Sequence, residues 1–128
     1  MRLLLDTHAL LWALDDNERF GPTARGLIAD PANDVLVSVV SLWEIAIKLR
    51  AGKVKADIKS VSEALGRTGV TLLGIEVAHL STLAGLPAHH RDPFDHLLIA
   101  QAITEGATLM SEDQNMPRYP VQAIGCSG

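Results

Sequence analysis

The stretch Arg2-Leu3-Leu4-Leu5-Asp6-Thr7-His8-Ala9-Leu10-Leu11-Trp12 decides the fold of this chain. Its run of leucines predicts a short buried strand over residues 3–6. Asp6 or Thr7 can cap a helix over residues 8–14, which is apolar on nearly every side. A buried strand that leads directly into a buried helix is the unit from which parallel α/β folds are built.

Helical and extended segments continue to alternate along the rest of the chain. The predicted helices span residues 22–30, 42–50 (capped by Ser41), 58–67, 76–85 and 93–106, and the predicted strands span 35–39, 70–73, 107–110 and 121–124. The strands are continuously apolar, which is typical of a parallel sheet covered on both faces. We therefore expect a single α/β domain over residues 1–128, with three layers (α/β/α) and a central parallel sheet.

Composition excludes several classes of protein. A hydrophobic content of 48% with 20% charged residues is that of a globular chain, and a net charge of −4 does not indicate a generic nucleic-acid binder. Cys126 is the single cysteine, which fits a reducing compartment. Asp6 interrupts the apolar N-terminal run, and no run approaches the roughly 20 residues of a membrane span. We expect a cytoplasmic protein without a signal peptide or a membrane partner.

Four acidic residues lie inside or directly against apolar segments, namely Asp6, Glu44, Asp95 and Asp113. Asp6 and Asp113 lie at the ends of predicted strands, and Glu44 falls in the first turn of a helix that follows another strand. The carboxyl ends of parallel strands meet at one edge of a sheet, so we expect all four carboxylates at the same rim. Ionised carboxylates in an apolar setting are costly unless paired or bound to metal. The pattern indicates a divalent-cation site and hence phosphate chemistry.

Each of these carboxylates, taken alone, also has an ordinary structural explanation. Asp6 can cap the helix that follows it, and Asp113 can form a turn in a loop. Glu44 can pair at the surface with Lys48, one helical turn further on. These explanations compete with the metal-site hypothesis at every position.

Residues Asp92, Pro93 and Asp95 have the spacing that begins a helix. With Asp92 as the N-cap, Pro93 takes the first helical position and Asp95 the third, as in a capping box. This explains Asp92 structurally, and it offers the same explanation for Asp95. The helix N-terminus would also keep Asp95 ionised and available to a metal.

The five histidines do not form a metal-binding motif. His89 and His90 are adjacent, so their side chains are expected to point apart. The sequence also lacks a Cys/His zinc spacing, a glycine-rich phosphate-binding loop and a nucleophile elbow.

A positive cluster is formed by Lys48, Arg50, Lys53, Lys55 and Lys59, with Asp57 as the one opposing charge among them. One interpretation is a solvated surface on two helices and their connection. The other is a strip that follows the phosphates of a nucleic acid beside the acidic site. The second interpretation assigns RNA binding to Lys48, Arg50, Lys53 and Lys55.

Four segments together resemble PIN-domain nucleases. Residues 4–12 (LLDTHALLW) resemble the opening motif, and residues 38–45 (SVVSLWEI) the second. Residues 90–102 (HRDPFDHLLIAQA) resemble the third, which is the longest and most specific. Residues 111–113 (SED) with 119–121 (YPV) match the fourth. The resemblance covers nearly the whole chain in the right order, and the most similar branch is that of the VapC-like toxins.

The resemblance implies a PIN-like fold and a defined site. Its metal ligands, which are also its catalytic residues, would be Asp6, Glu44, Asp95 and Asp113. Thr7 and Ser111 match hydroxyl positions that support the site, and Asp92 belongs to the third motif. An all-carboxylate site suits Mg²⁺ or Mn²⁺. The implied activity is hydrolysis of RNA by metal-activated water, which leaves a 5′-phosphate and a 3′-hydroxyl.

The resemblance also implies partners. A VapC-like toxin acts on RNA and is held in check by a small VapB-like antitoxin, and a homodimer is expected. Two other functions stay open: a non-catalytic PIN-fold module that binds RNA or a protein, and a receiver-like phosphoacceptor domain that binds Mg²⁺. The receiver-like domain ranks low, because it requires two adjacent acids after the first strand, where this chain has Asp6-Thr7.

Overall fold

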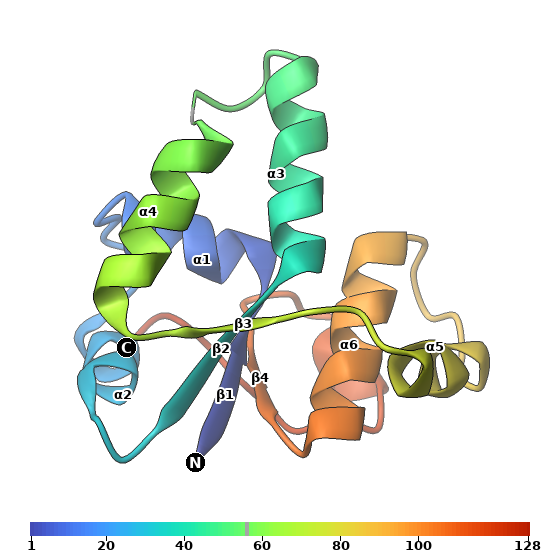
Figure 1. The fold of residues 1–128 in the computed structure, drawn as a ribbon. Helices are drawn as coiled ribbons and strands as arrows, with labels where there is room; N and C mark the ends of the chain where they lie inside the picture. Colours follow the sequence, from blue (N-terminus) through green and yellow to red (C-terminus); the bar gives the residue numbers. More distant parts are fainter. Residues whose placement is uncertain (56) are drawn as a thin grey trace.

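The computed structural model describes residues 1–55 and 57–128, and it contains one sheet of five parallel strands (Figure 1). The order across the sheet is β3-β2-β1-β4-β5. The strands are β1 (Arg2–Leu5), β2 (Asp34–Ser38), β3 (Thr71–Leu73), β4 (Thr108–Met110) and β5 (Ala123–Ile124). The first strand of the chain is therefore the central one, as its three buried leucines predict.

Helices cover both faces of this sheet. They are α1 (Thr7–Leu14), α2 (Pro22–Ala29), α3 (Val39–Arg50), α4 (Ile58–Thr68), α5 (Val77–Ala84) and α6 (Pro93–Glu105), followed by a 3₁₀ turn at Met116–Arg118. Leu3 and Leu5 of β1 pack with residues of α1, α2 and α4, whereas Leu4 packs with residues of α6. Figure 1 shows α1, α2 and α4 on one side of the sheet and α5 and α6 on the other. The predicted three-layer α/β/α fold is confirmed.

Helix α3 begins three residues earlier than the sequence predicted. The predicted cap, Ser41, lies inside the helix and is buried, and Ser38 is the N-cap. The Ser38 hydroxyl accepts a hydrogen bond from the Val40 N–H at 3.0 Å. The β-branched residues Val39 and Val40 favoured a strand locally, but this cap turns the chain into a helix as β2 ends. Glu44 consequently lies in the second helical turn, not in the first.

The other predicted elements are present, with ends that differ by one or two residues. The last strand is the shortest, with pairing limited to Ala123 and Ile124. Within residues 1–55 and 57–128, no helix is long and apolar enough to cross a membrane.

Candidate metal centre

An open pocket of about 360 Å³ lies where β1 and β4 end. We call it the acidic pocket, and it is lined by Asp6, His8, Trp12, Asp92, Asp95, Glu112 and Asp113. Three of the four predicted metal ligands therefore lie around one cavity. Glu44 is the exception, because it does not line this cavity.

Asp6 follows β1 directly and performs the capping role that its position predicted. Its Oδ1 accepts a hydrogen bond from the Ala9 N–H at 2.8 Å at the start of α1. Its side chain is also hydrogen-bonded to Ser111, and it is buried, with 4% of its surface exposed. Burial raises the pKa of Asp6, and these two hydrogen bonds oppose the rise. Asp6 therefore caps α1 and also lines the acidic pocket.

Helix α6 brings a second pair of carboxylates to the pocket. Asp92 is its N-cap, with Oδ1 accepting from the N–H groups of Phe94 and Asp95 at 2.9 and 3.3 Å. The reciprocal half of the predicted capping box is missing among the hydrogen bonds of the described residues. Asp95 Oδ2 instead lies 3.3 Å from His90 Nε2. The capping role predicted for Asp92 is confirmed. The Asp95 carboxylate does not take part in the cap and lines the acidic pocket instead.

Asp95 carries the most perturbed carboxyl group of the site. Burial raises its pKa to about 8, and the negative charges of Asp92, Asp6, Asp113 and Glu44 add to the rise, in that order. A carboxyl group that holds its proton at neutral pH because it is buried among other carboxylates is ready to exchange that proton for a cation. Glu44 makes the smallest of these contributions, and its side chain does not line the pocket.

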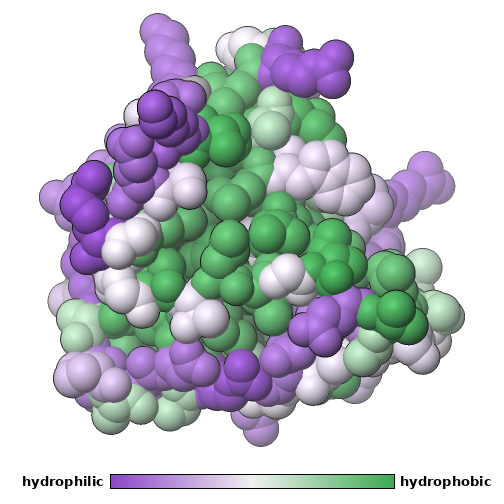
Figure 2. All heavy atoms as spheres, viewed as in Figure 1, coloured by the Kyte–Doolittle hydropathy of each residue, from purple (hydrophilic) through white to green (hydrophobic). Residues whose placement is uncertain are grey.

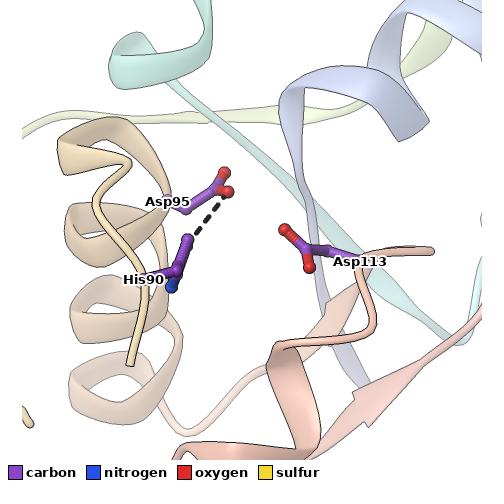
Figure 3. Close-up of side chains that lie close together, drawn as sticks. All are labelled: His90, Asp95 and Asp113. Atoms are coloured by element: carbon purple, nitrogen blue, oxygen red, sulfur yellow. Dashed lines mark hydrogen bonds and ion pairs between the residues drawn. The ribbon is translucent and has the colours of Figure 1, made fainter. Parts of the chain in front are cut away.

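Asp113 and His90 complete a compact group with Asp95 (Figure 3). One ligand atom from each of the three lies within 4.8 Å of the other two. Asp113 also forms the predicted loop turn, with Oδ1 accepting from the Asn115 N–H at 2.8 Å. The sequence predicted that the histidines form no metal-binding motif, and the structure adds that one of them, His90, lies beside the carboxylates of Asp95 and Asp113. His90 comes close to Asp95 because its ring is held by Tyr119, a contact between residues that are far apart in the sequence.

Glu44 is buried beside the pocket, with 6% of its surface exposed. Its Oε1 accepts from the Thr7 hydroxyl at 2.7 Å, and its Oε2 pairs with Lys48 Nζ at 3.0 Å. The predicted pair with Lys48 is present, but it is not an ordinary surface pair because Glu44 is not solvated. Thr7 therefore links Glu44 to the end of β1, while Ser111 bonds to Asp6 across the sheet.

Glu112 was expected to be solvated, and it is exposed, but it also lines the acidic pocket. Its Oε1 accepts hydrogen bonds from the backbone N–H groups of Cys126 and Ser127, and these bonds lower the pKa of Glu112. This contact places residues 126 and 127 beside the acidic pocket. Nothing local to Glu112 in the sequence signals a partner 15 residues away.

The donor set fits a hard divalent cation. The pocket offers several carboxylate oxygens, and the raised pKa values of Asp6 and Asp95 show that these carboxyl groups are destabilised in their charged forms. Mg²⁺ and Mn²⁺ prefer oxygen ligands, and bound positive charge would offset this destabilisation.

A comparison with protein families decides the classification. The sequence profile of the PIN domain family matches residues 3–122. This chain belongs to the PIN domain family. The resemblance of the four sequence motifs to this family is confirmed.

Individual relatives agree with this assignment. The PIN domain is 32% identical over 77 residues to "Ribonuclease VapC16" of Mycobacterium tuberculosis, a match that covers 56% of this chain and 55% of that protein. The match thus spans about half the length of this curated relative.

Solved structures share the fold at low sequence identity. VapBC2 from Rickettsia felis, bound to a DNA fragment from its promoter, gives a TM-score of 0.77 at 19% identity, with 98% of each chain covered. FitAcB from Neisseria gonorrhoeae gives 0.68 at 18% identity, with 95% of this chain and 96% of that chain covered.

Proposed function

We propose that this PIN domain is a Mg²⁺- or Mn²⁺-dependent endoribonuclease. The observation that carries the proposal is the gathering of Asp6, Asp95 and Asp113 around one pocket, where burial and the neighbouring carboxylates raise the pKa of Asp95 to about 8. Such a group is unfavourable in the absence of a cation and becomes favourable in its presence. The ribonuclease named among its relatives supports the choice of RNA as the substrate.

Some residues of the pocket would bind the ion, and others donate hydrogen bonds that orient these ligands. Asp6, Asp95 and Asp113 are the proposed direct ligands. Glu44 accepts a hydrogen bond from Thr7 outside the pocket lining and would contribute only its negative charge. When bound, the ion would lower the pKa of water and stabilise negative charge on the phosphodiester. The chain orients its own ligands through the bonds from the Ala9 N–H and Ser111 to Asp6 and from the Asn115 N–H to Asp113.

A cleavage assay tests this function. Purified protein is incubated with structured and single-stranded RNAs, in Mg²⁺ or Mn²⁺ and in excess EDTA. We expect cleavage with either ion, 5′-phosphate products, and no cleavage in EDTA. An undiminished rate in EDTA would contradict the metal mechanism. RNA binding without cleavage in every buffer would identify a non-catalytic module instead.

Part of the predicted positive strip adjoins the acidic pocket. Lys53 and Lys55 line a groove of about 560 Å³, here called the lysine groove, and Trp12 lines both this groove and the acidic pocket. Lys48 is instead paired with Glu44, and Arg50 lines a different, smaller pocket. We propose that RNA leaves the acidic pocket past Trp12, that Lys53 and Lys55 bind its phosphates, and that Arg50 and Lys48 assist binding.

Reversing the charge of Lys53 and Lys55 is expected to weaken RNA binding and its salt dependence. Each lost phosphate contact should reduce the slope of log K against log salt by about 0.7 for a single strand. Fluorescence anisotropy with labelled RNA at several salt concentrations measures the slope. Arg67→Glu, an exposed cation in the last turn of α4, is the matched control. If the double variant has the same slope as the wild type, these lysines do not contact RNA phosphates and belong to an ordinary solvated surface.

Exposed apolar side chains gather outside the pocket. Trp43 and Ile47 on α3 are 54% and 41% exposed, and Leu72 on the edge strand β3 is 54% exposed. Figure 2 shows an apolar surface over the face where α3 and β3 lie. Such a patch marks a protein interface. We propose that a second copy of the chain covers it, and sedimentation velocity of the wild type against Ile47→Lys tests that homodimer.

A VapB-like antitoxin is the second proposed partner. Several solved relatives are VapBC assemblies, and the acidic pocket can accept an Arg side chain in place of a metal ion. We expect a small protein encoded beside this chain to co-purify with it and to relieve growth arrest on co-expression. If that protein neither binds nor relieves arrest, the toxin role fails while the nuclease proposal stands.

A further inference from the structure

Tyr119 is buried beside the third motif, and its hydroxyl group is fully engaged. The Tyr119 Oη accepts hydrogen bonds from the backbone N–H groups of His89 at 3.0 Å and of His90 at 3.2 Å. A phenolic hydroxyl has acceptor capacity for these two donors and one proton of its own to donate. That proton is left for a third partner.

The third partner is the ring of His90. Its Nδ1 lies 2.7 Å from Tyr119 Oη. Because the hydroxyl oxygen already accepts two N–H groups, it donates to Nδ1, and Nδ1 must be the unprotonated nitrogen. A neutral imidazole then carries its proton on Nε2. The ring is further held by edge-to-face contacts with Tyr119 and His96, at centroid distances of 5.4 and 4.8 Å.

The protonated nitrogen points at the acidic pocket. His90 Nε2 lies 3.3 Å from Asp95 Oδ2 (Figure 3). We propose that Tyr119 and His90 form a positioning pair, in which His90 donates from Nε2 to Asp95 and orients that carboxylate towards Asp113 instead of binding the metal itself. The positioning role of His90 rests on the proposed metal-dependent function. The assignment of the His90 proton to Nε2 does not depend on that function.

The alternative, His90 as a metal ligand, conflicts with the geometry around Tyr119. Ligation through Nε2 requires its lone pair and moves the proton to Nδ1. Nδ1–H would then face a hydroxyl oxygen that already accepts two N–H groups, and the hydroxyl proton would lose its acceptor. A buried group left without a partner is unfavourable. The proximity of His90 to Asp95 and Asp113 is therefore explained by hydrogen bonding, as for groups that orient metal ligands in other proteins.

The tautomer can be measured directly on the wild-type protein. Long-range ¹H–¹⁵N correlation spectra distinguish Nε2–H from Nδ1–H imidazole, and His90→Gln assigns the His90 signals by their absence. We expect the Nε2–H form for His90 both without metal and with Mg²⁺. Observation of the Nδ1–H form in either state would overturn the proposal. Tyr119→Phe, which removes the hydroxyl alone, should give a mixture of the two forms.

Mn²⁺ binding, measured by calorimetry without RNA, tests the positioning role. The amide of His90→Gln can still donate to Asp95, whereas His90→Leu cannot. We expect a loss of about 10- to 100-fold in Mn²⁺ affinity for His90→Leu and about threefold for His90→Gln. Equal losses in the two variants would overturn the role, provided that thermal unfolding shows both to be folded.

These readouts separate the inference from the proposed function. Absence of RNA cleavage would contradict the proposed activity and leave the tautomer and affinity results intact. A wild-type protein that binds no Mn²⁺ would overturn the metal proposal and the positioning role together, while the spectra would still decide the state of His90.

Discussion

Asp95→Asn and Asp113→Asn are each expected to lower the rate of RNA cleavage at least about a thousandfold, equivalent to about 4 kcal/mol of transition-state stabilisation. Both substitutions keep the size of the side chain and remove a charged oxygen ligand. Asp113 would also keep its turn, because an asparagine carbonyl can accept from the Asn115 N–H as the carboxylate does at 2.8 Å. The loss would therefore report on the metal site and not on folding.

The measurement is the initial rate of cleavage of one labelled RNA in saturating Mn²⁺. Glu63→Gln is the matched control, because Glu63 is an exposed carboxylate on α4 and lies outside the acidic pocket. It should cleave at the wild-type rate. If either aspartate variant retained more than about a tenth of the wild-type rate, which is a difference of about 1.4 kcal/mol, its residue would not be a required ligand.

The second large effect is on stability in the absence of metal. Asp95→Asn is expected to stabilise the metal-free protein at pH 8 by about 2–4 kcal/mol, because it removes a carboxyl group that is costly to ionise in the folded state. This range is below the value that the full shift of the pKa would give, because the pocket is open and the Asp95 side chain is 16% exposed. The corresponding rise in melting temperature is roughly 5–15 °C.

The raised pKa of Asp95 determines how the stability of the metal-free protein changes with pH. The pKa of Asp95 is about 8 in the folded protein, and its ordinary value is 3.8. Between these values the folded protein binds more protons than the unfolded chain, so wild-type stability falls as pH rises through this window. Thermal unfolding in EDTA at pH 5.5 and pH 8 should show a larger advantage for Asp95→Asn at pH 8. An advantage that is equal at both pH values would refute the raised pKa.

Local sequence rules were sufficient for much of the site. Asp6 and Asp113 were placed correctly at strand ends because continuous apolar runs define buried parallel strands. Asp92 was predicted as an N-cap because a following proline at the first helical position is a local signal. These features depend on neighbours within a few residues, and the structure reproduces them.

Features that depend on distant contacts were not predictable in this way. The β-branched residues Val39 and Val40 pointed to a strand where α3 begins, and Ser38 can be identified as its cap only once β2 is known to end there. Glu44 is buried where α3 packs against α1, and it accepts a hydrogen bond from Thr7, 37 residues earlier. The ring of His90 is held beside Asp95 by Tyr119, 29 residues later. Each of these requires knowledge of which elements pack together.

The positions of the two tryptophans give the chain its own optical reporters. Trp12 lines both the acidic pocket and the lysine groove, and Trp43 belongs to the exposed apolar patch and packs edge-on against Phe94. With Trp43→Phe, fluorescence comes from Trp12 alone and responds to paramagnetic Mn²⁺ or to a stacked base. With Trp12→Phe, emission comes from Trp43 and shifts to the blue when another chain covers the patch. Occupancy of the pocket and association at the patch are thus observable as separate spectroscopic signals, without attached dyes.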